Sequence, residues 1–198
     1  MNQPHDSAHL HVSGQSEYVD DRPALKGELF VDILWSREPH ARISKLDTKK
    51  ARALPGVAGI FLADDFHENL WGTIFKDQPL LAKDEVRFAG EGMALIAAES
   101  AESARRARDV IEVKFQALPP LLSIEEAKAQ KSFIAGTRKI ERGHVDEALR
   151  LATHTLEGRV VIRGADHFYL ESQAAIAYPR EDGQIEIHSS SQHPTEVQ

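Results

Sequence analysis

Residues 91–115 read EGMALIAAESAESARRARDVIEVKF and predict a strand, a helix and a second strand in succession. The segment opens with a short, continuous apolar run, which is typical of a buried strand. Ser100 follows the run and can cap the helix after it. Three alanines share one face of that helix at helical spacing: Ala101, Ala104 and Ala107. The last residues, VIEVKF, alternate between apolar and polar side chains, which indicates another strand.

The same alternation of strands and helices is predicted before this segment. GELFVDILWS (27–36) is apolar on both faces, which indicates a strand that is buried on both sides. RISKLD (42–47) is a shorter alternating strand. Asp47 or Thr48 can cap the helix KKARAL, which ends before a Pro-Gly pair, and GVAGIFLA then reads as a strand.

The C-terminal third predicts two short helices and an antiparallel sheet. Ser123 with Glu126 has the spacing of a capping box, and HVDEALRLA (144–152) is helical in pattern. The sheet is predicted from three segments with strand patterns and a PREDG turn: THTLEGRVVIRG (153–164), SQAAIAYP (172–179) and GQIEIHSSS (183–191). Mixed strands and helices of this kind predict an α+β fold.

Composition and charge exclude several classes of function. Hydrophobic residues make up 41% of the 198 positions and charged residues 28%, which are ordinary values for a globular protein. The net charge of −7 argues against nucleic acid as a partner. The absence of cysteine excludes disulfides, thiolate nucleophiles and iron–sulfur ligation within this chain. Without a signal-like N-terminus or an apolar run long enough to span a bilayer, we expect a cytoplasmic protein.

Four blocks of the sequence carry a family resemblance. They are HVSGQSEYVDDRP (11–23), GELFVDILWSREPHARISKLDTKKARALPGVAGIFLADD (27–65), VRFAGEGMALIAAESAESARRARDVIEVKFQALPPLLSIEEA (86–127) and RGADHFYLESQAAIAYPREDGQIEIHSSSQHPTEVQ (163–198). The first three blocks resemble the α/β hammerhead domain of the molybdenum-binding subunit in the xanthine dehydrogenase and aldehyde oxidase family. The fourth is similar to the start of that subunit's molybdopterin-binding domain.

The resemblance implies a domain organisation. Residues 1–13 are expected to be a flexible tail, 14–127 the hammerhead domain and 128–142 a linker. Residues 143–198 are expected to be the first part of the molybdopterin-binding domain. The sequence stops at Gln198 shortly after an alternating strand, which suggests a fragment of a larger subunit.

The resemblance also implies a function. The intact enzyme is expected to hydroxylate purines, aldehydes or related heterocycles oxidatively, with water as the oxygen source, and to take part in purine catabolism. It is expected to use a molybdenum–pterin cofactor, with iron–sulfur clusters and FAD on partner subunits or domains, and to be an oligomer. Gln192, in the family's Ser-Thr-Gln segment, is expected to donate a hydrogen bond to an oxo ligand of molybdenum. No catalytic residue and no metal ligand is expected here, so the 198 residues alone are expected to be inactive.

The sequence departs from the family pattern and leaves alternatives open. Ala165 stands where the family has Gln, and Arg163 replaces Gly. A non-catalytic module that binds the iron–sulfur and flavin subunits is the main alternative. A hydrolase built on His167 with two neighbouring carboxylates, Asp166 and Glu171, lacks an activated nucleophile.

Other chemistry-bearing groups have simple structural interpretations. The histidines at positions 5, 9 and 11 could bind a metal, but nothing in the sequence positions their rings. The Asp20–Asp21 and Asp64–Asp65 pairs suit turns and caps better than a Mg²⁺ site.

Overall fold

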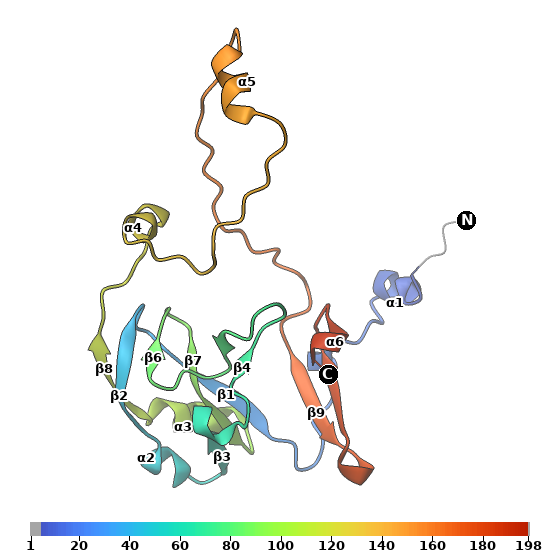
Figure 1. Ribbon diagram of the computed structural model, residues 1–198. Coiled ribbons are helices and arrows are strands. Elements are labelled where there is room, and N and C mark those ends of the chain that lie inside the picture. Colours follow the sequence, from blue (N-terminus) through green and yellow to red (C-terminus); the bar gives the residue numbers. More distant parts are fainter. Residues whose placement is uncertain (1–4, 198) are drawn as a thin grey trace. The chain divides into compact units, whose positions relative to one another are not determined.

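The computed structural model describes residues 5–197 (Figure 1). The elements, in chain order, are α1 (Ala8–Ser13), η1 (Val19–Asp21), β1 (Phe30–Trp35), β2 (Ala41–Asp47), α2 (Lys49–Arg52), β3 (Val57–Phe61), η2 (Ala63–Asp65), β4 (Leu70–Trp71), β5 (Gln78–Pro79), β6 (Glu85–Val86), β7 (Gly92–Ala98), α3 (Ala101–Asp109), β8 (Glu112–Ala117), α4 (Ile124–Ala129), α5 (Val145–Leu151), β9 (Ala175–Pro179), η3 (Glu181–Gly183), β10 (Ile185–Ser189) and α6 (Pro194–Val197). Residues 1–4 of the predicted tail lie outside the described residues. Residues 121–170 form one compact unit, and the remaining described residues form another.

Residues 91–115 form the predicted strand, helix and strand as β7, α3 and β8, and β7 lies in the first sheet. Its strand order is β1-β7-β3, and both pairings are antiparallel, with Phe30 opposite Ala98 and Ile60 opposite Ile96. Helix α3 crosses this sheet and contacts all three of its strands (Figure 1). β7 lies at the centre of this sheet, and its apolar side chains are buried or half-buried.

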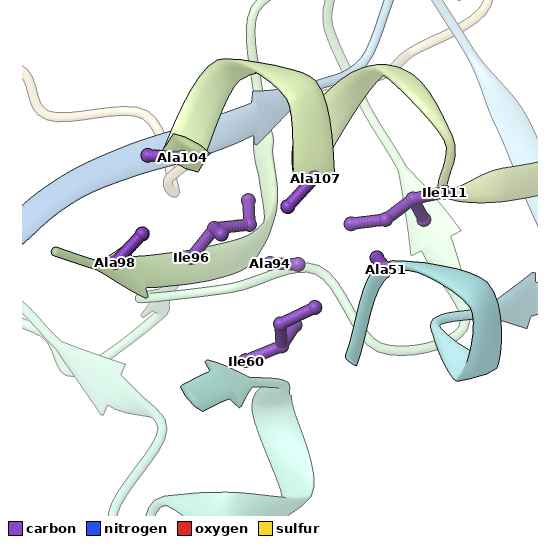
Figure 2. Packing of buried hydrophobic residues seen from close by; sticks show 8 residues of the cluster. All are labelled: Ala51, Ile60, Ala94, Ile96, Ala98, Ala104, Ala107 and Ile111. Atoms are coloured by element: carbon purple, nitrogen blue, oxygen red, sulfur yellow. The ribbon is translucent and has the colours of Figure 1, made fainter. Parts of the chain in front are cut away.

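The main core lies between α3 and this sheet. Figure 2 shows Ala104 and Ala107 of α3 above Ile96 of β7, with Ile60 of β3 on the other side of the cluster. All four side chains are buried. Because alanine side chains are short, the helix can approach the sheet closely and leave room for the two isoleucines.

The opposite face of the same sheet carries exposed apolar side chains in the described part of the chain, which corrects the prediction that residues 27–36 form a strand buried on both sides. Val31 remains 61% exposed. It lines a shallow apolar hollow whose other lining residues are Phe61, Phe66, Leu95 and Ala97. The strand alternates between the two faces, so Leu34 packs toward the core. Arg108 of α3 forms a 2.9 Å ion pair with Asp32 on the helix side. The sequence predicted the strand correctly, but it could not show that only one face has a helix over it.

A second sheet has the strand order β6-β2-β8, and its pairings are also antiparallel. Its small core consists of Ala41, Ala82, Val86 and Met93. Leu34 and Leu46 pack against both clusters, so the two cores of this unit are continuous.

Removal of the N-cap of α3 is expected to lower the stability of the unit that contains the main core. The Ser100 hydroxyl accepts a hydrogen bond from the Ser103 backbone N–H at 3.1 Å. We expect Ser100→Ala to lower the free energy of unfolding by about 1 kcal/mol, because one helix N–H group loses its partner. Urea denaturation followed by circular dichroism would measure the change. Ser123→Ala, at the cap of the exposed helix α4, is the matched control and should leave the urea midpoint of the main unfolding transition unchanged.

His40 joins the end of β8 to β6. Its Nδ1 lies 2.9 Å from the carbonyl oxygen of Pro119, and its Nε2 lies 3.1 Å from Oε1 of Glu85. Both partners are acceptors, so only the protonated ring can donate to both. The Pro119 carbonyl, followed by the Glu85 carboxylate, raises the pKa of His40 above its ordinary value, while nearby Arg87 opposes the shift.

This raised pKa predicts a pH-dependent contribution to stability. A raised folded-state pKa means that the contribution is fully present below the unfolded pKa, about 6.5, and is lost as pH rises through the folded value. Between about pH 5 and 8, we expect His40→Gln to lower the melting temperature of the chain most at the acid end of the range. NMR titration of the His40 ring would measure its pKa directly. A midpoint below the ordinary histidine value would contradict the prediction.

The unit formed by residues 121–170 confirms both predicted helices. The Ser123 and Glu126 side chains form the reciprocal capping box at the start of α4, and α5 follows. Arg159 donates to Glu125 at 2.6 Å within this unit.

The predicted strand at 153–164 is wrong, because this segment is irregular. Its apolar side chains are largely exposed, and Val160 and Ile162 are exposed at 84% and 90%. A strand exists through its pairing, and no strand in the described part of the chain pairs with these residues.

Candidate functional site

Gln192 follows the C-terminal hairpin formed by β9 and β10. The two strands pair antiparallel from Ile185 opposite Pro179 to Ser189 opposite Ala175. Their turn uses Asp182 and Gly183, both with positive φ, and the backbone N–H of Arg180 donates to the carbonyl of Gln184 at 2.8 Å. This confirms the hairpin and turn predicted between residues 172 and 191.

Serine side chains fix the backbone on both sides of Gln192. The Ser190 hydroxyl accepts from the Ala174 N–H at 3.1 Å, and the Ser190 N–H donates to the Ala174 carbonyl at the same distance. The Ser191 hydroxyl then accepts from the His193 N–H at 3.1 Å. Gln192 lies between these two hydrogen-bonded positions, and its side chain is exposed.

The middle of the hairpin is held by an electrostatic cluster. The Glu186 carboxylate accepts from His188 Nε2 at 2.5 Å and from Arg180 Nε at 2.7 Å. These two donors, His188 first, hold the pKa of Glu186 below its usual range. The guanidinium of Arg180 also lies over the Tyr178 ring, 5.5 Å from its centroid. The cluster links the two strands through side chains as well as through the backbone.

Two contacts join the start of the hairpin segment to a part of the chain that lies far away in sequence. The Ser172 hydroxyl donates to Oδ2 of Asp20 at 2.6 Å. The Val19 N–H donates to Oε1 of Glu171 at the longer distance of 3.5 Å. No local sequence pattern predicts these contacts, because the paired residues are 152 positions apart.

The residues of the possible hydrolase have other contacts. Oδ1 of Asp166 accepts from the Phe168 backbone N–H at 3.1 Å, which is a local turn contact. Glu171 accepts from Val19, and the His167 side chain is exposed. These contacts do not show a nucleophile, base and orienting acid brought together.

The remaining sequence candidates act as turn and surface groups. Asp21 and Asp65 cap their own 3₁₀ turns by accepting from the Tyr18 and Leu62 N–H groups, and Asp64 pairs with Lys83. His5 and His11 hydrogen-bond to serine hydroxyls. No group of three or more histidine, cysteine, aspartate or glutamate side chains within residues 5–197 is placed to hold a metal ion.

The groups around Gln192 can donate and accept hydrogen bonds. A carboxamide offers two N–H donors and an oxygen acceptor, and the neighbouring groups are hydroxyls and backbone amides. Such a set fits the oxygen and nitrogen atoms at the edge of a pterin-type cofactor. It is suited to orient such a group through hydrogen bonds.

The comparison with protein families identifies the first part of this architecture. Residues 13–119 match the family model described as aldehyde oxidase and xanthine dehydrogenase, a/b hammerhead domain. The chain belongs to this family. Residues 125–198 match the molybdopterin cofactor-binding domain, so the hairpin and Gln192 fall within the second match. These matches confirm the family resemblance of the four sequence blocks and the predicted α+β fold class.

Curated family members are similar over almost the whole chain. Aldehyde oxidase 1 of Rattus norvegicus is 40% identical over 196 residues, which cover 98% of this chain and 14% of that protein. Xanthine dehydrogenase of Drosophila pseudoobscura pseudoobscura is 38% identical over 198 residues, which cover 98% of this chain and 15% of that protein. The chain therefore spans about one seventh of the length of these relatives.

Solved family structures share the fold. The aldehyde oxidoreductase of Desulfovibrio gigas superposes with a TM-score of 0.76 at 27% identity, covering 95% of this chain and 23% of that one. Quinoline 2-oxidoreductase of Pseudomonas putida 86 superposes with a TM-score of 0.78 at 26% identity, covering 94% of this chain and 26% of that one. No helix among the described residues has the length and apolar character needed to cross a membrane.

Proposed function

We propose that this chain is the N-terminal part of the molybdenum-binding subunit of a molybdenum hydroxylase. The observation that carries the proposal is the exposed amide of Gln192, which follows the hydrogen-bonded serines Ser190 and Ser191 within the match to the molybdopterin cofactor-binding domain. Residues 13–119 would then be the hammerhead scaffold beside the cofactor domain. Because the chain spans only 14–15% of the curated relatives, the activity is proposed for the intact protein.

Gln192 would contribute a positioned donor to this site. Its amide N–H would hydrogen-bond an oxygen of the cofactor, and the serine contacts on each side would limit the movement of its backbone. The cofactor, when bound, would supply the redox chemistry that oxidises the substrate. Gln192 would orient that group and would not itself transfer a proton, since a carboxamide does not titrate.

The substrate class and the partners follow from the same proposal. The relatives are named for aldehydes, xanthine and quinoline, so we propose a small aldehyde or nitrogen heterocycle as substrate. Electrons would leave through iron–sulfur clusters and FAD on partner subunits or domains, in an oligomeric cytoplasmic enzyme. A role in purine catabolism would follow if the substrate is a purine.

The proposal is tested on the intact protein purified from its source. We expect molybdenum in about one equivalent per subunit by elemental analysis, and substrate-dependent dye reduction with an aldehyde, xanthine or quinoline. The 198-residue chain alone should bind no molybdenum and reduce no dye. Intact protein without molybdenum, or an isolated chain with molybdenum-dependent activity, would contradict the proposal.

A non-catalytic scaffold is the second candidate, and the uncovered face of the sheet β1-β7-β3 favours it. Apolar side chains such as Val31 and Phe61 are exposed there, which is typical of a surface that another protein covers. Capture of iron–sulfur and flavin subunits by a protein that carries no molybdopterin would support this alternative.

A further inference from the structure

The C-terminal hairpin needs support from outside its own two strands. β9 and β10 form a separate two-stranded sheet in the described part of the chain. An isolated pair of strands is marginally stable in water, so other contacts must limit its movement. The internal cluster around Glu186 links the two strands to each other but does not fix the hairpin to the rest of its unit.

The contact between Asp20 and Ser172 provides such support. The 2.6 Å distance and the ionised acceptor mark it as a charge-assisted hydrogen bond. Asp20 is held by a compact turn, because Asp21 accepts from the Tyr18 N–H at 2.9 Å and donates its own N–H to the Tyr18 carbonyl at 3.1 Å. The neighbouring Val19 N–H contacts Glu171, so two successive residues of the turn meet two successive residues before the hairpin.

The contact continues to Gln192 through short steps of backbone. Ser172 lies two residues before Ala174, which exchanges hydrogen bonds with Ser190. Ser190 lies two residues before Gln192. A displacement at Ser172 would therefore reach the Gln192 amide through the hydrogen bonds between Ala174 and Ser190 and the short backbone segment from Ser190 to Gln192.

We propose that Asp20 is a positioning residue, which holds Ser172 and thereby fixes the hairpin that presents Gln192. This inference rests on the proposed function of Gln192. Asp20 itself would touch neither cofactor nor substrate. Its effect would arise because a donor must be held within a fraction of an ångström of its acceptor to act on it.

The first test measures the hairpin itself, without any cofactor. In the 198-residue chain, we expect Asp20→Ala and Ser172→Ala each to raise amide hydrogen exchange in β9, β10 and residues 190–193 by roughly threefold to tenfold. The double variant should add little to either single variant, because both remove the same hydrogen bond. Glu17→Gln is the matched control, since it removes a charge from the same exposed segment and should leave exchange unchanged.

The second test measures the consequence in the intact enzyme. Asp20→Ala should lower kcat several-fold with a smaller change in KM and with molybdenum content retained. Unchanged exchange in both single variants would overturn the inference, whatever the function of Gln192. Faster exchange with unchanged kcat would show that the contact between Asp20 and Ser172 stabilises the hairpin. That outcome would instead contradict the role of Gln192 on which the inference rests. If Asp20→Ala fails to fold, Ser172→Ala decides the outcome alone.

Discussion

Ile96→Ala is expected to lower the free energy of unfolding of this chain by about 2–5 kcal/mol. Ile96 lies in the centre of β7 and is fully buried between α3 and the sheet. The side chains of Ala104 and Ala107 of α3 lie above it. They are too short to fill the cavity that Ile96→Ala would leave. The helix can relax only partly, because the ion pair between Arg108 and Asp32 also fixes its distance from β1.

Urea denaturation followed by circular dichroism would measure this loss. Ile74→Ala is the matched control, because the Ile74 side chain is 79% exposed and should contribute almost nothing. Equal effects of the two changes would mean that the cluster in Figure 2 is not the core that stabilises the unit.

Gln192→Ala is expected to lower kcat of the intact enzyme by about tenfold to a hundredfold, which is the usual cost of removing a group that orients a metal centre without binding it. The molybdenum content should be retained, because the amide is not a ligand. The spectroscopic signal of the molybdenum centre should shift as well, since an oxygen of the cofactor would lose its hydrogen-bond donor. Gln192→Glu should not restore the rate, because a carboxylate accepts hydrogen bonds and does not donate them.

Steady-state kinetics with elemental analysis would measure both quantities. Gln130→Ala, at the exposed end of α4, is the matched control and should leave kcat unchanged. Full activity of Gln192→Ala would contradict the proposed contact with the cofactor.

Local rules were sufficient for the elements around the core. Ser100 and Ser123 cap their helices as their positions predict, and the run before Ser100 forms a central strand. The turn within PREDG also forms as predicted. In each case the decisive interaction joins residues that are close in sequence, so the pattern contains the needed information.

Long-range partners explain what the sequence could not predict. Within residues 5–197, no helix crosses one face of β1, so that face stays exposed, and no strand pairs with the segment at 153–164, so that segment is irregular. The candidate site shows the same division. Gln192 was selected by its resemblance to a family motif, whereas the contact of Asp20 with Ser172 became visible only in three dimensions.

The irregular segment has a consequence for solubility. Val160, Val161 and Ile162 have strong β propensity and are exposed, and no strand among the described residues pairs with them, so we expect this segment to favour aggregation between molecules. Arg159 and Arg163 enclose this tripeptide on both sides, and charges at such flanks disfavour stacking of identical segments. Neutralising both guanidinium positions, or screening them with concentrated salt, should therefore shorten the lag before fibrils form.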